Sequence, residues 1–98
     1  MIERIVIMTF SEESIADFLE IFDASAEKIR AFPGNHGLKL IQHTSKHSQL
    51  STYSLWDSEE SLNNYRNSEL FATTWAKTKV LFSEKPIAFS NRIVRGPF

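Results

Sequence analysis

The spacing of apolar residues changes along the chain, and each change marks a predicted element. Residues 2–10 are rich in β-branched and apolar side chains, which predicts a strand. Alternate side chains point to opposite sides of this strand: Val6, Met8 and Phe10 to one side, Ile5 and Ile7 to the other. Both sides are apolar, so both faces of the strand are expected to be covered.

A helix is predicted over residues 12–31, where apolar side chains recur every three or four positions. Ser11 is placed to cap its N-terminus, and the pair Pro33-Gly34 ends it. Residues 37–44 and 49–56 follow as two strands joined by a short polar loop. This arrangement is typical of a β-hairpin.

The second half of the chain predicts two short helices and a last strand. Asp57 and Glu60 have the spacing of a capping box, which starts a helix. The run Asn67-Ser68-Glu69 predicts a break and a second cap, with a further helix over residues 69–82. Residues 87–94 read as the final strand, before a tail that ends at Phe98.

The predicted order β-α-β-β-α-β is that of the ferredoxin-like α+β fold, with an antiparallel sheet and helices on one face. We expect residues 1–98 to form a single domain of this kind. The helices would leave Ile5 and Ile7 uncovered, so we expect a homodimer with the two sheets face to face. Such an interface would bury on the order of 800 Å² or more per partner.

Composition narrows the function classes. The chain has no cysteine and a formal net charge of −1. Disulfides, iron–sulfur clusters and thiol nucleophiles are therefore excluded, and no basic stripe supports nucleic-acid binding. Neither a signal peptide nor a membrane span is expected, and we expect a cytoplasmic protein. The 3 glycines form no phosphate-binding or dinucleotide motif, so no cofactor is predicted.

Several segments together resemble a known family. They are Phe32-Pro33-Gly34, Gly37-Leu38, the run from Tyr53 to Leu62 (YSLWDSEESL) and Ser68-Glu69-Leu70-Phe71. This pattern is similar to the antibiotic biosynthesis monooxygenase (ABM) domain of the dimeric α+β barrel superfamily. The resemblance implies a homodimer with a cavity between the sheet and the helices of each subunit.

Candidate site residues are mainly aromatic. The resemblance implies that Trp56 lines the cavity and stacks on a flat substrate. Phe71 and Trp75 lie four residues apart and share a helix face. With Met8 and Phe10 opposite, they could form an apolar slot for a small apolar or aromatic molecule. The alternative is that these rings simply fill the core. His43 is the candidate general base, with a half-exposed strand histidine as the alternative. The other polar candidates are Tyr53, Tyr65, Asn91 and Arg92, but strand alternation means that they cannot all line one pocket.

Two classes of function stay open on these grounds. One is a cofactor-independent monooxygenase-like oxidoreductase, which the resemblance implies for an aromatic or quinol-type substrate. The other is a non-catalytic dimer that binds a small ligand or is structural. A haem-degrading relative is a third, minor reading. That branch needs a histidine where this chain has Trp75, whose ring nitrogen can only donate a hydrogen bond.

Overall fold

The computed structural model describes residues 1–96; Pro97 and Phe98, the end of the predicted tail, lie outside the described residues. The strands are β1 (Ile2–Thr9), β2 (Asn35–Gln42), β3 (Gln49–Trp56) and β4 (Ile87–Arg92). The helices are the 3₁₀ turn η1 (Glu12–Ser14), α1 (Ile15–Arg30), α2 (Glu59–Arg66) and α3 (Glu69–Lys79). The strands form one antiparallel sheet in the order β2-β3-β1-β4. The predicted ferredoxin-like α+β fold is confirmed.

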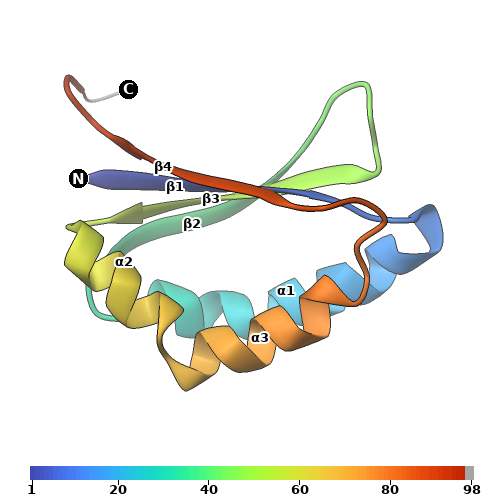
Figure 1. Ribbon diagram of the computed structural model, residues 1–98, viewed down its shortest axis with the longest axis horizontal. Coiled ribbons are helices and arrows are strands. Elements are labelled where there is room, and N and C mark those ends of the chain that lie inside the picture. Colours follow the sequence, from blue (N-terminus) through green and yellow to red (C-terminus); the bar gives the residue numbers. More distant parts are fainter. Residues whose placement is uncertain (97–98) are drawn as a thin grey trace.

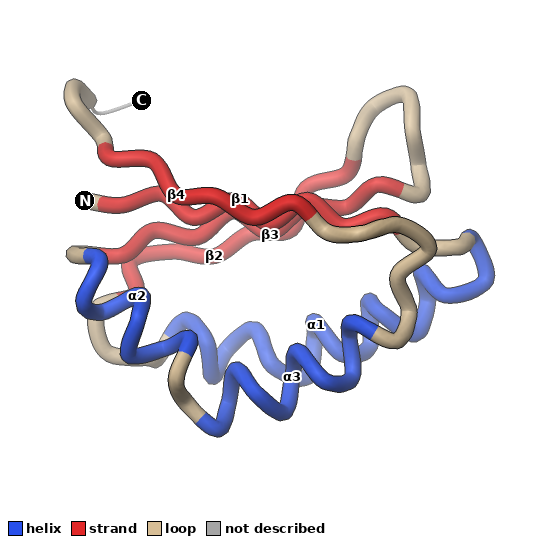
Figure 2. Tube along the Cα trace, in the orientation of Figure 1, coloured by secondary structure: helices blue, strands red, loops and turns tan. Residues whose placement is uncertain are grey.

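All three α-helices lie on the same side of the sheet, as Figures 1 and 2 show. Two buried clusters join the layers. The larger contains Met8, Phe10, Phe18 and Leu50, and the smaller contains Ile2, Trp56 and Leu62. The predicted sidedness of the first strand is therefore correct. Among the helices of residues 1–96, none is both long enough and apolar enough to cross a membrane.

The other face of the sheet carries a second apolar surface with no helix over it. Register places Ile5 between Tyr53 of β3 and Phe89 of β4, and Ile7 opposite Ile87. On this face Ile87 is 60% exposed and Phe89 is 39% exposed. We call this surface the open face. It consists of side chains from all four strands: Ile5, Ile7, Ile41, Tyr53, Leu55, Ile87 and Phe89.

The ends of the helices differ in part from the prediction. The segment predicted as one helix over 12–31 begins with the 3₁₀ turn, and α1 itself ends at Arg30. Ser11 does not cap the backbone; its hydroxyl shares a hydrogen bond of 2.9 Å with the Ser14 hydroxyl. The helix predicted to 82 ends at Lys79, because Phe82 instead forms a bridge with Phe10 beside the sheet.

The caps of the two later helices depend on serine. The prediction that Asp57 caps α2 is wrong, since Ser58 is the N-cap and its Oγ accepts a hydrogen bond from the Ser61 amide at 3.1 Å. The cap predicted within Asn67-Ser68-Glu69 is confirmed and lies at Ser68, whose Oγ accepts from the Phe71 amide at 3.2 Å. Both hydroxyls satisfy amides that the first helical turn leaves unpaired.

Two strand boundaries also move. The strand predicted over 37–44 begins at Asn35 and ends at Gln42, and the strand predicted over 87–94 ends at Arg92. The earlier start of β2 follows from Gly34, which turns the chain with a φ of +89°. This is a conformation that glycine adopts without strain. Its carbonyl accepts a hydrogen bond of 2.9 Å from the Asp57 amide, which ties the turn to the end of β3.

Candidate functional site

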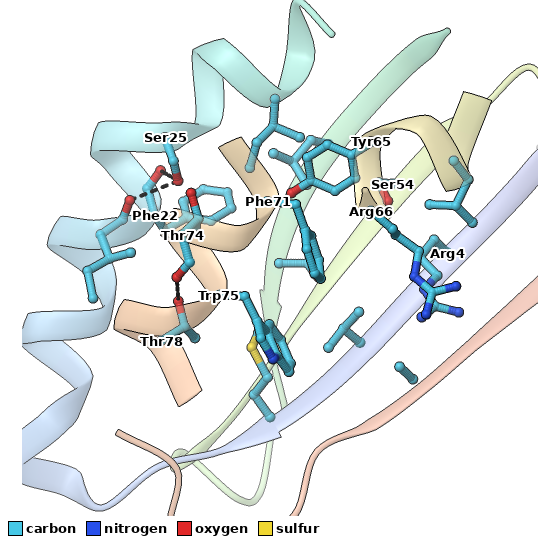
Figure 3. Close-up of a pocket in the computed structure, with 18 of the residues that line it drawn as sticks. Arg4, Phe22, Ser25, Ser54, Tyr65, Arg66, Phe71, Thr74, Trp75 and Thr78 are labelled. Atoms are coloured by element: carbon cyan, nitrogen blue, oxygen red, sulfur yellow. Dashed lines mark hydrogen bonds between the residues drawn. The ribbon is translucent and has the colours of Figure 1, made fainter. Parts of the chain in front are cut away.

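A cavity of about 350 Å³ lies between the sheet and the helices (Figure 3). It is large because the sheet side carries mostly short side chains at its centre. Thr52 and Ser54 of β3 and Ala88 of β4 line it there. The opposite wall is formed by the helices, with Phe22 of α1 and Trp75 of α3 among its residues. The sheet side of the cavity, its floor, therefore mixes polar and apolar side chains, and the helix side is mainly apolar, with several aromatic rings.

The four residues predicted to contact a substrate come together in this cavity. Met8, Trp56, Phe71 and Trp75 all line it. The Phe71 and Trp75 rings are stacked, with centroids 5.8 Å apart and planes 11° from parallel. Phe10 was expected to face them, but it is 1% exposed and packs instead in the core against Phe18.

Trp56 contributes mainly as a support. Its side chain is 0% exposed, and its ring is stacked on Tyr65 with centroids 5.0 Å apart. The Nε1–H group donates a hydrogen bond of 3.0 Å to the Ser54 hydroxyl, which fixes the ring orientation. Trp56 therefore completes the core and also lies in the cavity wall, where it supports the Tyr65 ring.

Tyr65 is the central polar group of the aromatic wall; the sequence named it as a polar candidate but did not assign it to the substrate site. Figure 3 shows Tyr65, Phe71 and Trp75 in a row. Its ring meets Phe71 edge-on with centroids 5.3 Å apart. Burial raises the pKa of the Tyr65 phenol to about 12. Among the described residues its hydroxyl has no hydrogen-bond partner, so it is a protonated donor available to a bound molecule.

Two arginines also line the cavity, and the sequence analysis missed both. Arg4 comes from β1 and Arg66 from the last turn of α2. Figure 3 places them together at the end of the cavity away from Ser25 and Thr78. Burial lowers the pKa of the Arg4 guanidinium, and the positive charge of Arg66 lowers it further. The strand alternation could have indicated Arg4, which shares a face with Met8.

The hydroxyls at the other end are occupied within their helices. Ser25 donates to the Ile21 carbonyl at 2.9 Å, and Thr78 donates to the Thr74 carbonyl at 2.8 Å. These bonds hold the hydroxyl protons against the helix backbones. Ser25 and Thr78 can therefore accept a hydrogen bond from a ligand more readily than they can donate one.

His43 does not line the cavity. It follows the last residue of β2, in the loop that leads to β3, and its Nδ1 accepts hydrogen bonds from the Ser45 and Lys46 amides, each 3.0 Å long. Through these two hydrogen bonds, the His43 side chain stabilises the loop between β2 and β3. Its role as a general base stays a prediction without geometric support. The cavity lining contains no histidine, aspartate or glutamate among the described residues.

The remaining polar candidates are dispersed. Tyr53 lies on the open face, where it donates a hydrogen bond to the Glu3 carboxylate, and burial followed by this bond raises its pKa to about 12. Asn91 is paired with Glu3 on that same face, away from the cavity. Arg92 lies 4.0 Å from the Glu59 carboxylate at the surface. Of the predicted polar groups, Tyr65 lines the cavity and the others do not, so they do not converge on one site.

Comparison with known proteins places the chain in a family. The family model described as "Antibiotic biosynthesis monooxygenase" matches residues 1–77, which is most of the chain. The chain belongs to the antibiotic biosynthesis monooxygenase (ABM) family. The match includes β1 to β3, α1, α2 and most of α3, and so all the cavity-lining elements except β4. No curated protein sequence matches this ABM chain.

Solved structures share the ABM fold of this chain at low sequence identity. A crystal structure of an antibiotic biosynthesis monooxygenase has a TM-score of 0.88 and 16% identity, covering 97% of this chain and 100% of that one. Rv0793 from Mycobacterium tuberculosis gives 0.89 and 15%, over 97% and 96%. The N63A mutant of SnoaB, a cofactor-independent oxygenase from Streptomyces nogalater, gives 0.85 and 13%, over 97% and 94%. These identities establish similarity of fold.

Proposed function

We propose that this ABM protein is a cofactor-independent monooxygenase that oxidises a small, flat aromatic or quinol-type substrate. The observation that carries the proposal is the aromatic cavity of about 350 Å³. This volume lies within the range of roughly 300–1,000 Å³ that small-molecule sites occupy. Phe71 and Trp75 offer stacked ring surfaces, and Tyr65 offers one hydroxyl donor. The similar fold of SnoaB, which is named a cofactor-independent oxygenase, supports this reaction class.

The reaction needs few groups from the protein. An anthrone-type substrate loses a proton to give an enolate, which passes an electron to oxygen. The carbon radical and the superoxide then combine through one oxygen atom, and the peroxide takes back a proton. The resulting hydroperoxide loses water to leave a quinone. One anthrone and one O₂ thus give one anthraquinone and one water. The Tyr65 hydroxyl would donate to the enolate oxygen, and such donors stabilise developing negative charge.

Oxygen uptake with a panel of anthrones and quinols tests this function. At least one substrate should give uptake and a quinone product, and Tyr65→Phe should lower kcat by roughly tenfold or more. Tyr53→Phe is the matched control, because Tyr53 lies on the open face. No uptake with any member of the panel, from a folded protein, would reject the proposal.

A non-catalytic ligand-binding protein is the second candidate. The observation in its favour is the absence of histidine, aspartate and glutamate from the cavity lining within residues 1–96. Such a lining has no conventional general base. Ligand binding without oxygen consumption, in the same panel, would favour this alternative.

We also propose that the protein is a homodimer joined through the open face. A surface with Ile87 60% exposed and Phe89 39% exposed is unfavourable in water. A second copy offers the same surface and can cover it at the standard size of roughly 800 Å² per partner. Sedimentation equilibrium should give a dimer, and Phe89→Glu should dissociate it. Leu19→Glu, an equally exposed site on α1, is the control. A monomeric native chain would contradict this assembly.

A further inference from the structure

The two arginines of the cavity have no acidic partner. The ion pairs of the described residues join Arg30 to Glu27, Lys46 to Glu84 and Arg92 to Glu59, and none includes Arg4 or Arg66. Arg4 donates one hydrogen bond, 3.1 Å long, to the Ser90 hydroxyl on β4. A guanidinium group has five N–H donors. Most N–H donors of Arg4 and Arg66 therefore make no hydrogen bond within the described part of the protein.

Arg4 is partly buried and, within residues 1–96, has no opposite charge beside it. It lies on the helix-covered face of β1, with Ser54 and Ser90 at the paired positions of β3 and β4. Removing a charged group from water costs free energy unless an opposite charge compensates for it. The nearby charge is instead the like charge of Arg66. An anion entering the cavity would relieve both costs.

We propose that Arg4 and Arg66 together bind an anionic oxygen group of the substrate while its aromatic body lies against Phe71 and Trp75. The group is a carboxylate, or a phenol or enol that ionises on binding. Two guanidinium groups favour the ionised form of such an oxygen. This explains how the cavity can work without a general base in its lining, since the proton of an acidified phenol or enol can leave to water. The inference deepens the proposed function, because it assumes that the cavity is the substrate site.

The preference of the cavity for an anion can be tested with two ligands of the same shape, one charged and one neutral. The probes are 2-naphthoate and 2-naphthamide, measured by calorimetry and by quenching of tryptophan fluorescence. Trp56 and Trp75 are the only tryptophans of the chain, and both line the cavity. We expect the carboxylate to bind at least about tenfold more tightly than the amide at low salt, with the difference shrinking as salt is added.

Charge-removing variants identify the residues. Arg66→Gln and Arg4→Gln should each lower 2-naphthoate affinity by about tenfold and change 2-naphthamide affinity little. Arg92→Gln removes the same charge from a surface site outside the cavity lining and is the matched control. Arg66 is exposed at the end of α2, so Arg66→Gln keeps the test open even where Arg4→Gln fails to fold.

A third probe separates the two sources of the anion. The absorbance of bound 2-naphthol reports its ionisation, which should occur at a pH at least one unit lower than in water and return toward the aqueous value in Arg66→Gln. A shift supports an ionised phenol as ligand, whereas selectivity for 2-naphthoate without a shift supports a permanent carboxylate. Equal affinity for naphthoate and naphthamide, an equal loss in Arg92→Gln, or no binding of any probe would overturn the inference. Anion-selective binding without oxygen uptake would reject the monooxygenase and leave this site in place.

Discussion

Replacing Trp56 with alanine tests the conclusion that this ring supports the fold as well as the cavity. Trp56 is 0% exposed and contacts two rings, stacked on Tyr65 at 5.0 Å and edge-on to Phe32 at 6.3 Å between centroids. Its Nε1–H also donates to Ser54. Trp75, by contrast, is half-buried and lines the cavity from the helix side. The two tryptophans should therefore differ in their effects on stability.

The contacts set the size of the effect. A buried tryptophan replaced by alanine costs about 3–5 kcal/mol of unfolding free energy. Within that total, each aromatic pair accounts for about 0.5–1.5 kcal/mol and the hydrogen bond for a similar amount. We expect Trp56→Ala to lower stability by about 4 kcal/mol, a large part of the roughly 5–15 kcal/mol that a domain has. Trp75→Ala, whose ring is only partly buried, should cost below about 2 kcal/mol.

Urea unfolding followed by circular dichroism measures both changes. All variants must be compared at one protein concentration, because the proposed dimer would make stability depend on concentration. Ser54→Ala is the control for the hydrogen bond alone and should cost about 1 kcal/mol. A loss for Trp56→Ala within about 1 kcal/mol of that for Trp75→Ala would refute the division of roles.

Three further predictions concern other parts of the chain. Gly34→Ala should lower stability by more than about 1 kcal/mol in urea unfolding, because φ is +89° and an added Cβ would collide with the Ser61 side chain; unchanged stability would contradict that geometry. In a Tyr53→Phe background, Tyr65 should ionise near pH 12 in the folded state, as followed by phenolate absorbance. Because the folded-state pKa is raised, the contribution of neutral Tyr65 to folding stability is complete below about pH 10. It is lost as the pH rises toward 12, at about 1.4 kcal/mol per pH unit. Ionisation near pH 10 in the folded protein would show that the phenol is not buried. His43→Ala should leave oxygen uptake unchanged, since the side chain contacts the loop and not the cavity, whereas lost uptake would restore it as a base.

Much of the fold could be predicted from the sequence because strand geometry leaves little choice. Side chains of a strand alternate between faces, so the positions of Ile5 and Met8 on opposite sides follow from their spacing alone. Helix caps were harder. Asp57 and Ser58 are both good capping residues, and only the direction of the chain after β3 decides that Ser58 accepts the amide bond.

The sequence predicted mainly the apolar residues of the site. Phe71 and Trp75 could be found because helical spacing brings residues four apart onto one face. Arg66 could not be found, and Tyr65 could be named only as a polar candidate. Their approach to Arg4 and Trp56 depends on how α2 packs against the sheet. His43 was assigned to a strand that in fact ends at Gln42. Because His43 lies beyond this end, the alternation of strand side chains between the two faces says nothing about whether it points to the cavity.

The cavity is a product of the sequence and not a defect of packing. At its floor, β1 carries Arg4 and Val6, and the paired positions on β3 and β4 are small or polar: Ser54 and Thr52 on one side, Ser90 and Ala88 on the other. A cavity left by poor packing would be filled by relaxation of its neighbours or would stay dry and apolar. Here the space persists because short side chains lie beneath a fixed aromatic wall, and the floor holds a cation that nothing in the described chain neutralises. Space, ring surface and unpaired positive charge in one place are what an aromatic anion requires.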